Sequence, residues 1–165
     1  MAGGTQCASH PGPDLMKIAI LRERLAHETR VAATPETVRK LAAQGLEVCI
    51  ERGAGRAAFM TDELFAAAGA SLADSSRAAL SEADIVLAVQ RPNVDDLVHF
   101  KLGAVLIGML SPFQDPAGVA AYAAHHVDAF AMELMPRITR AQSMDVLSSQ
   151  SNLAGYRAVI EACYV

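Results

Sequence analysis

The sequence is poor in the features by which several classes of protein are recognised. It has three cysteines among 165 residues, Cys7, Cys49 and Cys163, and this odd number without paired spacing argues against a disulfide framework and a zinc site. Its five histidines show no ligand spacing either, so we expect no metal. Basic residues are fewer than acidic ones, 14 against 18, which gives a formal net charge of -4. We therefore expect no nucleic-acid partner.

Long hydrophobic runs are also missing. No stretch reaches the ~18 apolar residues of a membrane helix, and the first residues lack the basic start and apolar centre of a secretory leader. We expect a cytoplasmic protein in which residues 1–15 are a disordered N-terminal extension and residues 16–165 form a single α/β domain. An apolar helix face still continues at the last residues, IEACYV, which suggests a domain truncated at its C-terminal helix.

What the sequence does contain is an alternation of short apolar runs with helical patterns. Five runs are strand candidates, and most are continuously apolar, as expected for strands covered on both faces. Such alternation predicts a parallel sheet with helices on both faces, in a flavodoxin-like or Rossmann-like layering. Helix starts are indicated at Thr34, Thr61, Asn93 and Asp115, and Ser148 or Ser149 is expected to cap the last helix. The strand candidates span residues 17–21, 46–51, 84–89, 104–109 and 127–134.

A glycine-rich turn at residues 53–58, GAGRAA, mimics a GxGxxG phosphate loop, with Asp74 about 20 residues further on. A dinucleotide loop works because its helix opens directly on the pyrophosphate. Here the helix pattern begins only at Thr61, so we interpret the segment as a glycine turn between a strand and a helix. The chain therefore lacks a GxGxxG dinucleotide domain of its own.

Polar side chains crowd the segment that follows the last strand candidate. Arg137, Gln142 and Asp145 offer a cation, an amide and an acceptor within nine residues, where a parallel sheet delivers its carboxyl edge. The set provides no general base at neutral pH, and direct hydride transfer between bound cofactors needs none. An ordinary loop followed by an amphipathic helix is the alternative. In the same way, Arg30 in the loop after the first strand either binds a carboxylate or belongs to a solvated loop.

At this point the residues resemble a known family. The runs KIAILRERLAHETRVAATPETVRKLAAQGLEV, AVLIGMLSPF and ELMPRITRAQSMDVLSSQSNLAGYRAV look like the N-terminal part of the alpha subunit of proton-translocating NAD(P) transhydrogenase, which is homologous to alanine dehydrogenase. The resemblance implies that Arg137 and Asp145 position the carboxamide end of the nicotinamide and that Gln142 aligns its ring. The catalytic residues would be Gln142 and Asp145, and the NAD(H)-contacting set would be Arg137, Ile138, Thr139, Gln142, Ser143, Met144, Asp145 and Ser148.

The same resemblance implies a set of partners. NAD(H) would be bound through a following Rossmann domain, and NADP(H) by another component. A membrane component would couple hydride transfer to proton translocation, so that this subunit lies in the cytoplasm, peripheral to the inner membrane through its partner subunits. We also expect a homodimer.

Two positions separate the relatives. Alanine dehydrogenases carry a substrate-binding lysine and a catalytic histidine where this sequence has Gln90 and Ser111. Glutamine lacks the charge of lysine, and serine does not carry a proton at neutral pH. We therefore expect hydride transfer between NAD(H) and NADP(H). The alternatives are half of an alanine dehydrogenase-like enzyme and a non-catalytic binding or assembly module.

Overall fold

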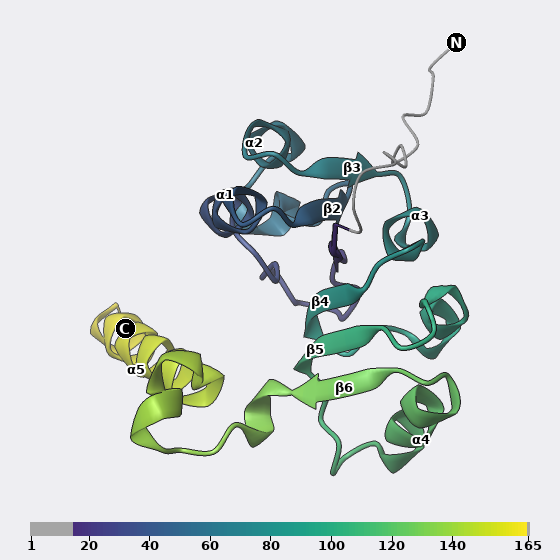
Figure 1. Ribbon diagram of the computed structural model, residues 1–165. Coiled ribbons are helices and arrows are strands. Elements are labelled where there is room, and N and C mark those ends of the chain that lie inside the picture. Colours follow the sequence, from purple (N-terminus) through teal and green to yellow (C-terminus); the bar gives the residue numbers. More distant parts are fainter. Residues whose placement is uncertain (1–14, 165) are drawn as a thin grey trace.

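The computed structural model describes residues 15–164, in which six strands form one parallel sheet (Figure 1). The strand order is β3-β2-β1-β4-β5-β6, the order of the Rossmann fold rather than the 2-1-3-4-5 order of flavodoxin. The parallel sheet that the sequence predicted is confirmed, although the three-residue strand β3 was not anticipated. The strands are β1 (Lys17–Ile20), β2 (Glu47–Glu51), β3 (Ser71–Ala73), β4 (Ile85–Gln90), β5 (Val105–Met109) and β6 (Asp128–Ala131).

Helices cover both faces of the sheet, as predicted (Figure 1). On one face lie α1 (Pro35–Ala43) and α2 (Asp62–Ala67), and on the other α3 (Ser76–Leu80), the 3-10 helix η2 (Val94–His99) and α4 (Pro116–Ala124). The chain leaves β6 through the 3-10 helices η3 (Met132–Leu134) and η4 (Thr139–Met144) and ends in α5 (Val146–Cys163), which extends away from the sheet. The expected extension at residues 1–15 lies, except for Leu15, outside the described residues.

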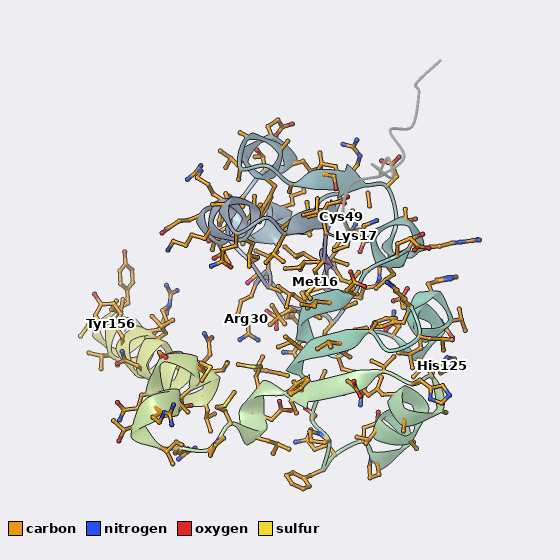
Figure 2. All side chains as sticks on the ribbon, viewed as in Figure 1. Met16, Lys17, Arg30, Cys49, His125 and Tyr156 are labelled. Atoms are coloured by element: carbon orange, nitrogen blue, oxygen red, sulfur yellow. The ribbon has the colours of Figure 1, made fainter. Side chains whose placement is uncertain are left out.

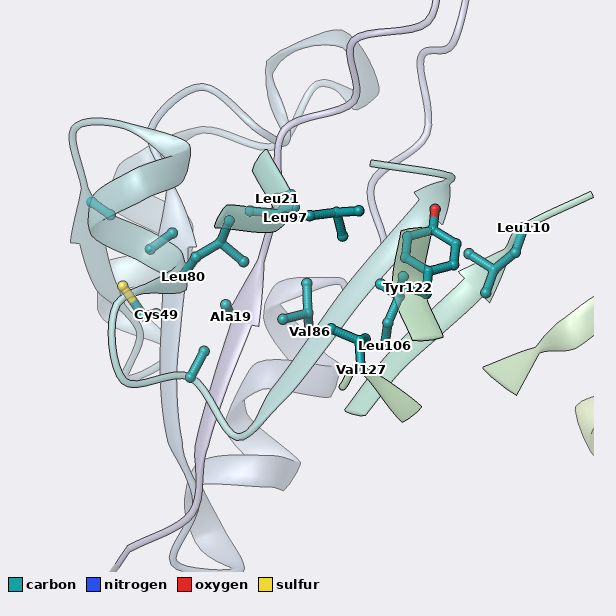
Figure 3. Close-up of a cluster of buried hydrophobic side chains, with 13 residues drawn as sticks. Ala19, Leu21, Cys49, Leu80, Val86, Leu97, Leu106, Leu110, Tyr122 and Val127 are labelled. Atoms are coloured by element: carbon teal, nitrogen blue, oxygen red, sulfur yellow. The ribbon is translucent and has the colours of Figure 1, made fainter. Parts of the chain in front are cut away.

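Alternation along the strands divides the core into two layers. Ile20 and Ile50 pack with Phe65 of α2, whereas Ala19 and Cys49, one residue away, face the opposite layer. The second layer is drawn in Figure 3, where residues of β1, β4 and β5 meet α3, η2 and α4. Each strand buries both faces, and this explains why its sequence is apolar throughout rather than alternating.

The helix starts follow the residues that the sequence indicated, with one correction. Thr34 accepts a hydrogen bond from the N–H of Thr37, with Pro35 at the first helical position. The predicted cap of the last helix was wrong. Asp145, not Ser148 or Ser149, is the N-cap of α5, because its carboxylate accepts the N–H of Ser148 and this places Ser148 inside the first turn.

The glycine turn at residues 53–58 is a packing device. Asp62 accepts the N–H of Gly53, 2.9 Å away, and the 3-10 helix η1 (Arg56–Ala58) separates the turn from α2. A Cβ on Gly55 would lie 2.6 Å from Phe65 Cε2 and 2.7 Å from the carbonyl oxygen of Met60. The turn therefore closes against a buried aromatic ring, as a strand-to-helix turn does.

This close approach predicts the effect of Gly55→Ala. The backbone φ of Gly55 is -90°, so strain comes from space alone, and overpacking of this kind costs about 1–3 kcal/mol in the free energy of unfolding. Urea unfolding should show the loss. Gly155→Ala is the matched control, because a Cβ there meets nothing within 4 Å and alanine is the better residue in a helix. Equal midpoints for Gly55→Ala and wild type would contradict the packing argument.

Candidate functional site

Glutamate carboxylates bind the backbone at the carboxyl ends of three strands. In this region the strands end and their N–H groups lose the ladder, so each buried N–H needs another acceptor. Burial raises the pKa of Glu23, and its two backbone hydrogen bonds oppose this rise. The edge of the sheet is thereby fixed atom by atom. Glu51 accepts from the N–H of Arg22, Glu23 from those of Val89 and Gln90, and Glu133 from those of Leu110 and Ser111.

A hollow opens at this edge between β1 and β4, where the strand order reverses. Ligands of open α/β sheets bind outside the carboxyl ends of the strands at such a switch point. The hollow encloses about 290 Å³, including space open to solvent, and its walls are mainly charged or amide side chains. They include Arg22, Glu23, Glu51, Gln90, Arg91 and Asp96.

Arg30 is bound within the protein, rather than open for a ligand or free in a solvated loop, the two interpretations that the sequence allowed. Its Nε donates to Glu28 Oε1 at 2.7 Å and its Nη2 to Glu28 Oε2 at 2.6 Å. The Glu28 side chain is 7% exposed, and Gln90 Nε2 donates to its Oε2 at 2.9 Å. The hydrogen bonds from Arg30 lower the pKa of Glu28 to about 2, and the same pair raises the pKa of Arg30.

The polar run that the sequence singled out, which we call the 137–148 segment, follows η3 and leads into α5. Ala141 is its one buried residue. Asp145 Oδ1 accepts the N–H of Ser148 at 3.0 Å, and Oδ2 accepts the Ser148 hydroxyl at 2.5 Å. These bonds lower the pKa of Asp145, with a smaller contribution from the charge of Arg137. The structure thus joins Asp145 to Ser148, whereas the side chains of the other predicted residues are exposed: Arg137, Ile138, Thr139, Gln142, Ser143 and Met144.

The 137–148 segment is connected to the switch-point edge through Arg30. Its Nη1 donates to Gln150 Oε1 of α5 at 3.2 Å, and Figure 2 shows Arg30 on the side of the sheet that α5 faces. The sequence placed Arg30 and Gln150 in two separate polar runs and gave no sign that they meet. Their separation of 120 residues is beyond any local pattern.

Neither a metal site nor a membrane helix is found in residues 15–164. No group of three or more histidine, cysteine, aspartate or glutamate side chains there is arranged to hold an ion. None of the helices in that range has the length and apolar character needed to span a bilayer.

The match to known proteins covers most of the chain. Residues 19–154 match the family described as alanine dehydrogenase/PNT, N-terminal domain. The chain belongs to this family. A relative from Rhodospirillum rubrum, the first of the polypeptides that make up its NAD(P) transhydrogenase subunit alpha, is 52% identical over 154 residues, which cover 90% of this chain and 40% of that protein.

A solved structure and a more distant relative define the position within the family. The transhydrogenase from Sinorhizobium meliloti has a TM-score of 0.85 at 43% identity and covers 90% of this chain and 44% of that one. Alanine dehydrogenase 1 of Staphylococcus aureus is 30% identical over 149 residues, 90% of this chain and 39% of that protein. The resemblance to the transhydrogenase alpha subunit is therefore confirmed. The chain spans about two fifths of the length of these relatives.

The depressed pKa of Glu28 predicts how stability depends on pH. A carboxylate whose pKa falls from 4.5 to about 2 on folding stabilises the protein fully above pH 4.5, and the contribution is lost as the pH falls towards 2. Glu28→Gln should lower the free energy of unfolding at pH 7, and its difference from wild type should shrink between pH 4.5 and pH 2. Urea titrations across that range measure this difference.

Glu36→Gln is the matched control for this titration. Glu36 is also paired with a cation, Lys40, but both side chains are 72% exposed, and exposed pairs of this kind contribute little. Its difference from wild type should stay small at every pH. A Glu28→Gln difference that does not change with pH would refute the role assigned to the pair.

Proposed function

We propose that this chain supplies the nicotinamide side of the NAD(H) site in the alpha subunit of a proton-translocating NAD(P) transhydrogenase. Hydride would pass from NADH to NADP⁺, or in reverse, while the 137–148 segment holds the nicotinamide. The observation that carries the proposal is the chemistry of this segment. Its arginine, glutamine and aspartate stand exposed beside the switch-point edge of a chain 52% identical to a transhydrogenase subunit.

The side chains fit the nicotinamide carboxamide in chemical type. The carboxamide presents one acceptor oxygen and one NH₂ donor. Arg137 has N–H groups for the oxygen, and within residues 15–164 the structure describes no hydrogen bond that occupies them. Asp145 and Gln142 have oxygens that accept from the NH₂ group. An aspartate whose pKa is lowered stays ionised at neutral pH and remains an acceptor.

The proposed reaction asks this chain to position a ring rather than to move a proton. Bound NADH supplies the hydride, so no general base is required. The residues of the segment orient the nicotinamide, and orientation is a large source of rate enhancement when two bound groups must meet. An ionised Asp145 suits this task, because it holds its charge throughout.

Amino-acid oxidation is less well supported, for reasons that lie at the sheet edge. Gln90 stands where alanine dehydrogenases carry a lysine, and its amide donates to Glu28. Ser111 stands in the place of their histidine, and its N–H is bound by Glu133. Arg30, the remaining residue of that substrate set, is occupied by Glu28. The three positions therefore serve the framework of the edge.

The proposed function requires partners beyond this chain. NAD(H) would bind through a following Rossmann domain, NADP(H) would be held by another component, and a membrane component would couple the transfer to proton movement. The subunit would lie on the cytoplasmic side, peripheral to the inner membrane. We expect it to form a homodimer.

The roles of Arg137 and Gln142 can be measured in the complete transhydrogenase. Arg137→Ala and Gln142→Ala should each slow hydride transfer more than ~10-fold, equivalent to about 1.4 kcal/mol of transition-state stabilisation. Arg157→Ala is the control, since Arg157 is an exposed cation that pairs with Glu161 one helical turn away. Hydride transfer is followed by stopped-flow absorbance. Unchanged rates in both loop variants would refute the proposed function.

Asp145 has two separable tasks, as a helix cap and as a nicotinamide contact. Asparagine caps a helix about as well as aspartate, whereas alanine loses about 1 kcal/mol. Asp145→Asn should therefore keep the helix content of wild type, which Asp145→Ala should not, yet transfer hydride several-fold more slowly than wild type because it lacks the charge. Circular dichroism and stopped-flow rates measure the two effects. A wild-type rate for Asp145→Asn would leave the residue as a cap alone.

A further inference from the structure

Helix α5 has little packing that would hold its first turns in place. None of its side chains is buried, and it packs against η3. Between α5 and residues 15–134, the structure describes one hydrogen bond, from Arg30 Nη1 to Gln150 Oε1. The orientation of the first turns of α5 therefore depends strongly on this bond.

The donor in this bond is itself fixed to the sheet. Glu28 holds the Arg30 guanidinium through two oxygens, and Gln90 at the end of β4 holds Glu28. Glu23 in turn accepts the N–H of Gln90 at 3.0 Å. A planar guanidinium gripped at two points has little freedom to rotate, so its remaining N–H groups point in a fixed direction towards α5.

The acceptor lies close to the 137–148 segment. Gln150 follows the N-cap Asp145 by five residues, about 7 Å along the helix axis at 1.5 Å per residue. Because Asp145 and Ser148 are bonded to each other within that first turn, fixing Gln150 also fixes the end of the segment. Side chains that position reacting groups need this kind of support from the residues behind them.

We infer that Arg30 and Gln150 form a latch that holds the 137–148 segment at the edge of the sheet, and that Arg30 is a positioning residue for hydride transfer. The latch itself stands on the geometry of this chain. Its role in hydride transfer rests on the proposed function. Arg30 acts through Gln150 and does not touch the nicotinamide.

Gln150→Ala is the variant that tests the latch. It removes the acceptor and leaves the buried Glu28–Arg30 pair intact, whereas Arg30→Ala would leave the Glu28 carboxylate without its cation and endanger folding. Gln150→Glu keeps an acceptor oxygen and adds charge, so it should restore the bond. Asn152→Ala, an exposed substitution on the same helix, is the matched control.

Trypsin digestion of this 165-residue chain reads out the latch without any cofactor. Cleavage after Arg137 and Arg140 requires local opening of the segment, and its rate follows the population of the open form. Gln150→Ala should raise the rate at these two sites about fivefold and leave the rate after Arg56 unchanged. Gln150→Glu and Asn152→Ala should match wild type. Equal rates at Arg137 and Arg140 in Gln150→Ala and wild type would overturn the latch.

Stopped-flow kinetics of the complete transhydrogenase read out positioning. Gln150→Ala should lower the hydride-transfer rate about fivefold with KM for NADH within about twofold of wild type, because alignment rather than binding is lost. Gln150→Glu should recover the rate. If Arg137→Ala slows transfer and Gln150→Ala does not, the positioning role is overturned. If neither slows it, the proposed function fails and the positioning role with it, while the trypsin result still decides the latch.

Discussion

The capping of strand ends by glutamate side chains is the constraint on which the rest of the site depends. A parallel sheet leaves unpaired N–H groups where its strands stop, and burying them without a partner costs free energy comparable to a lost hydrogen bond. Glu51, Glu23 and Glu133 satisfy these groups at the ends of β1, β4 and β5. The edge that an α/β fold offers to ligands is consequently rigid, and loops that leave it start from fixed positions.

The Glu28–Arg30 pair extends this rigid edge towards α5. A buried ion pair is poor evidence of net stability, because desolvation of both charges offsets their attraction. Its value here is directional. Glu28 is 7% exposed and held by Gln90, so the arginine is aimed and keeps one N–H for Gln150. The arginine that would bind a substrate carboxylate in an alanine dehydrogenase-like enzyme thus holds an internal carboxylate here.

The sequence predicts those parts of the fold that are encoded locally. The apolar runs that became β1, β2, β4, β5 and β6, and the caps at Thr34 and Asp115, depend on neighbouring residues. Strand β3 was missed because three residues, Ser71–Ala73, are too few to show a period. The glutamate caps were missed because each joins residues 22 to 67 positions apart. The polar run at 137–148 was visible in the sequence, but its attachment through Arg30 was not.

Asp145 shows how one side chain serves both the fold and the proposed site. The sequence assigned the cap to the serines that follow, because serine is a common cap and the aspartate was already assigned to the ligand. In the structure each carboxylate oxygen accepts one hydrogen bond from Ser148. A carboxylate oxygen accepts two, so one position on each oxygen is left for a carboxamide N–H. Capping therefore does not compete with binding: it orients the carboxylate and lowers its pKa, and both effects favour a permanent acceptor at the nicotinamide.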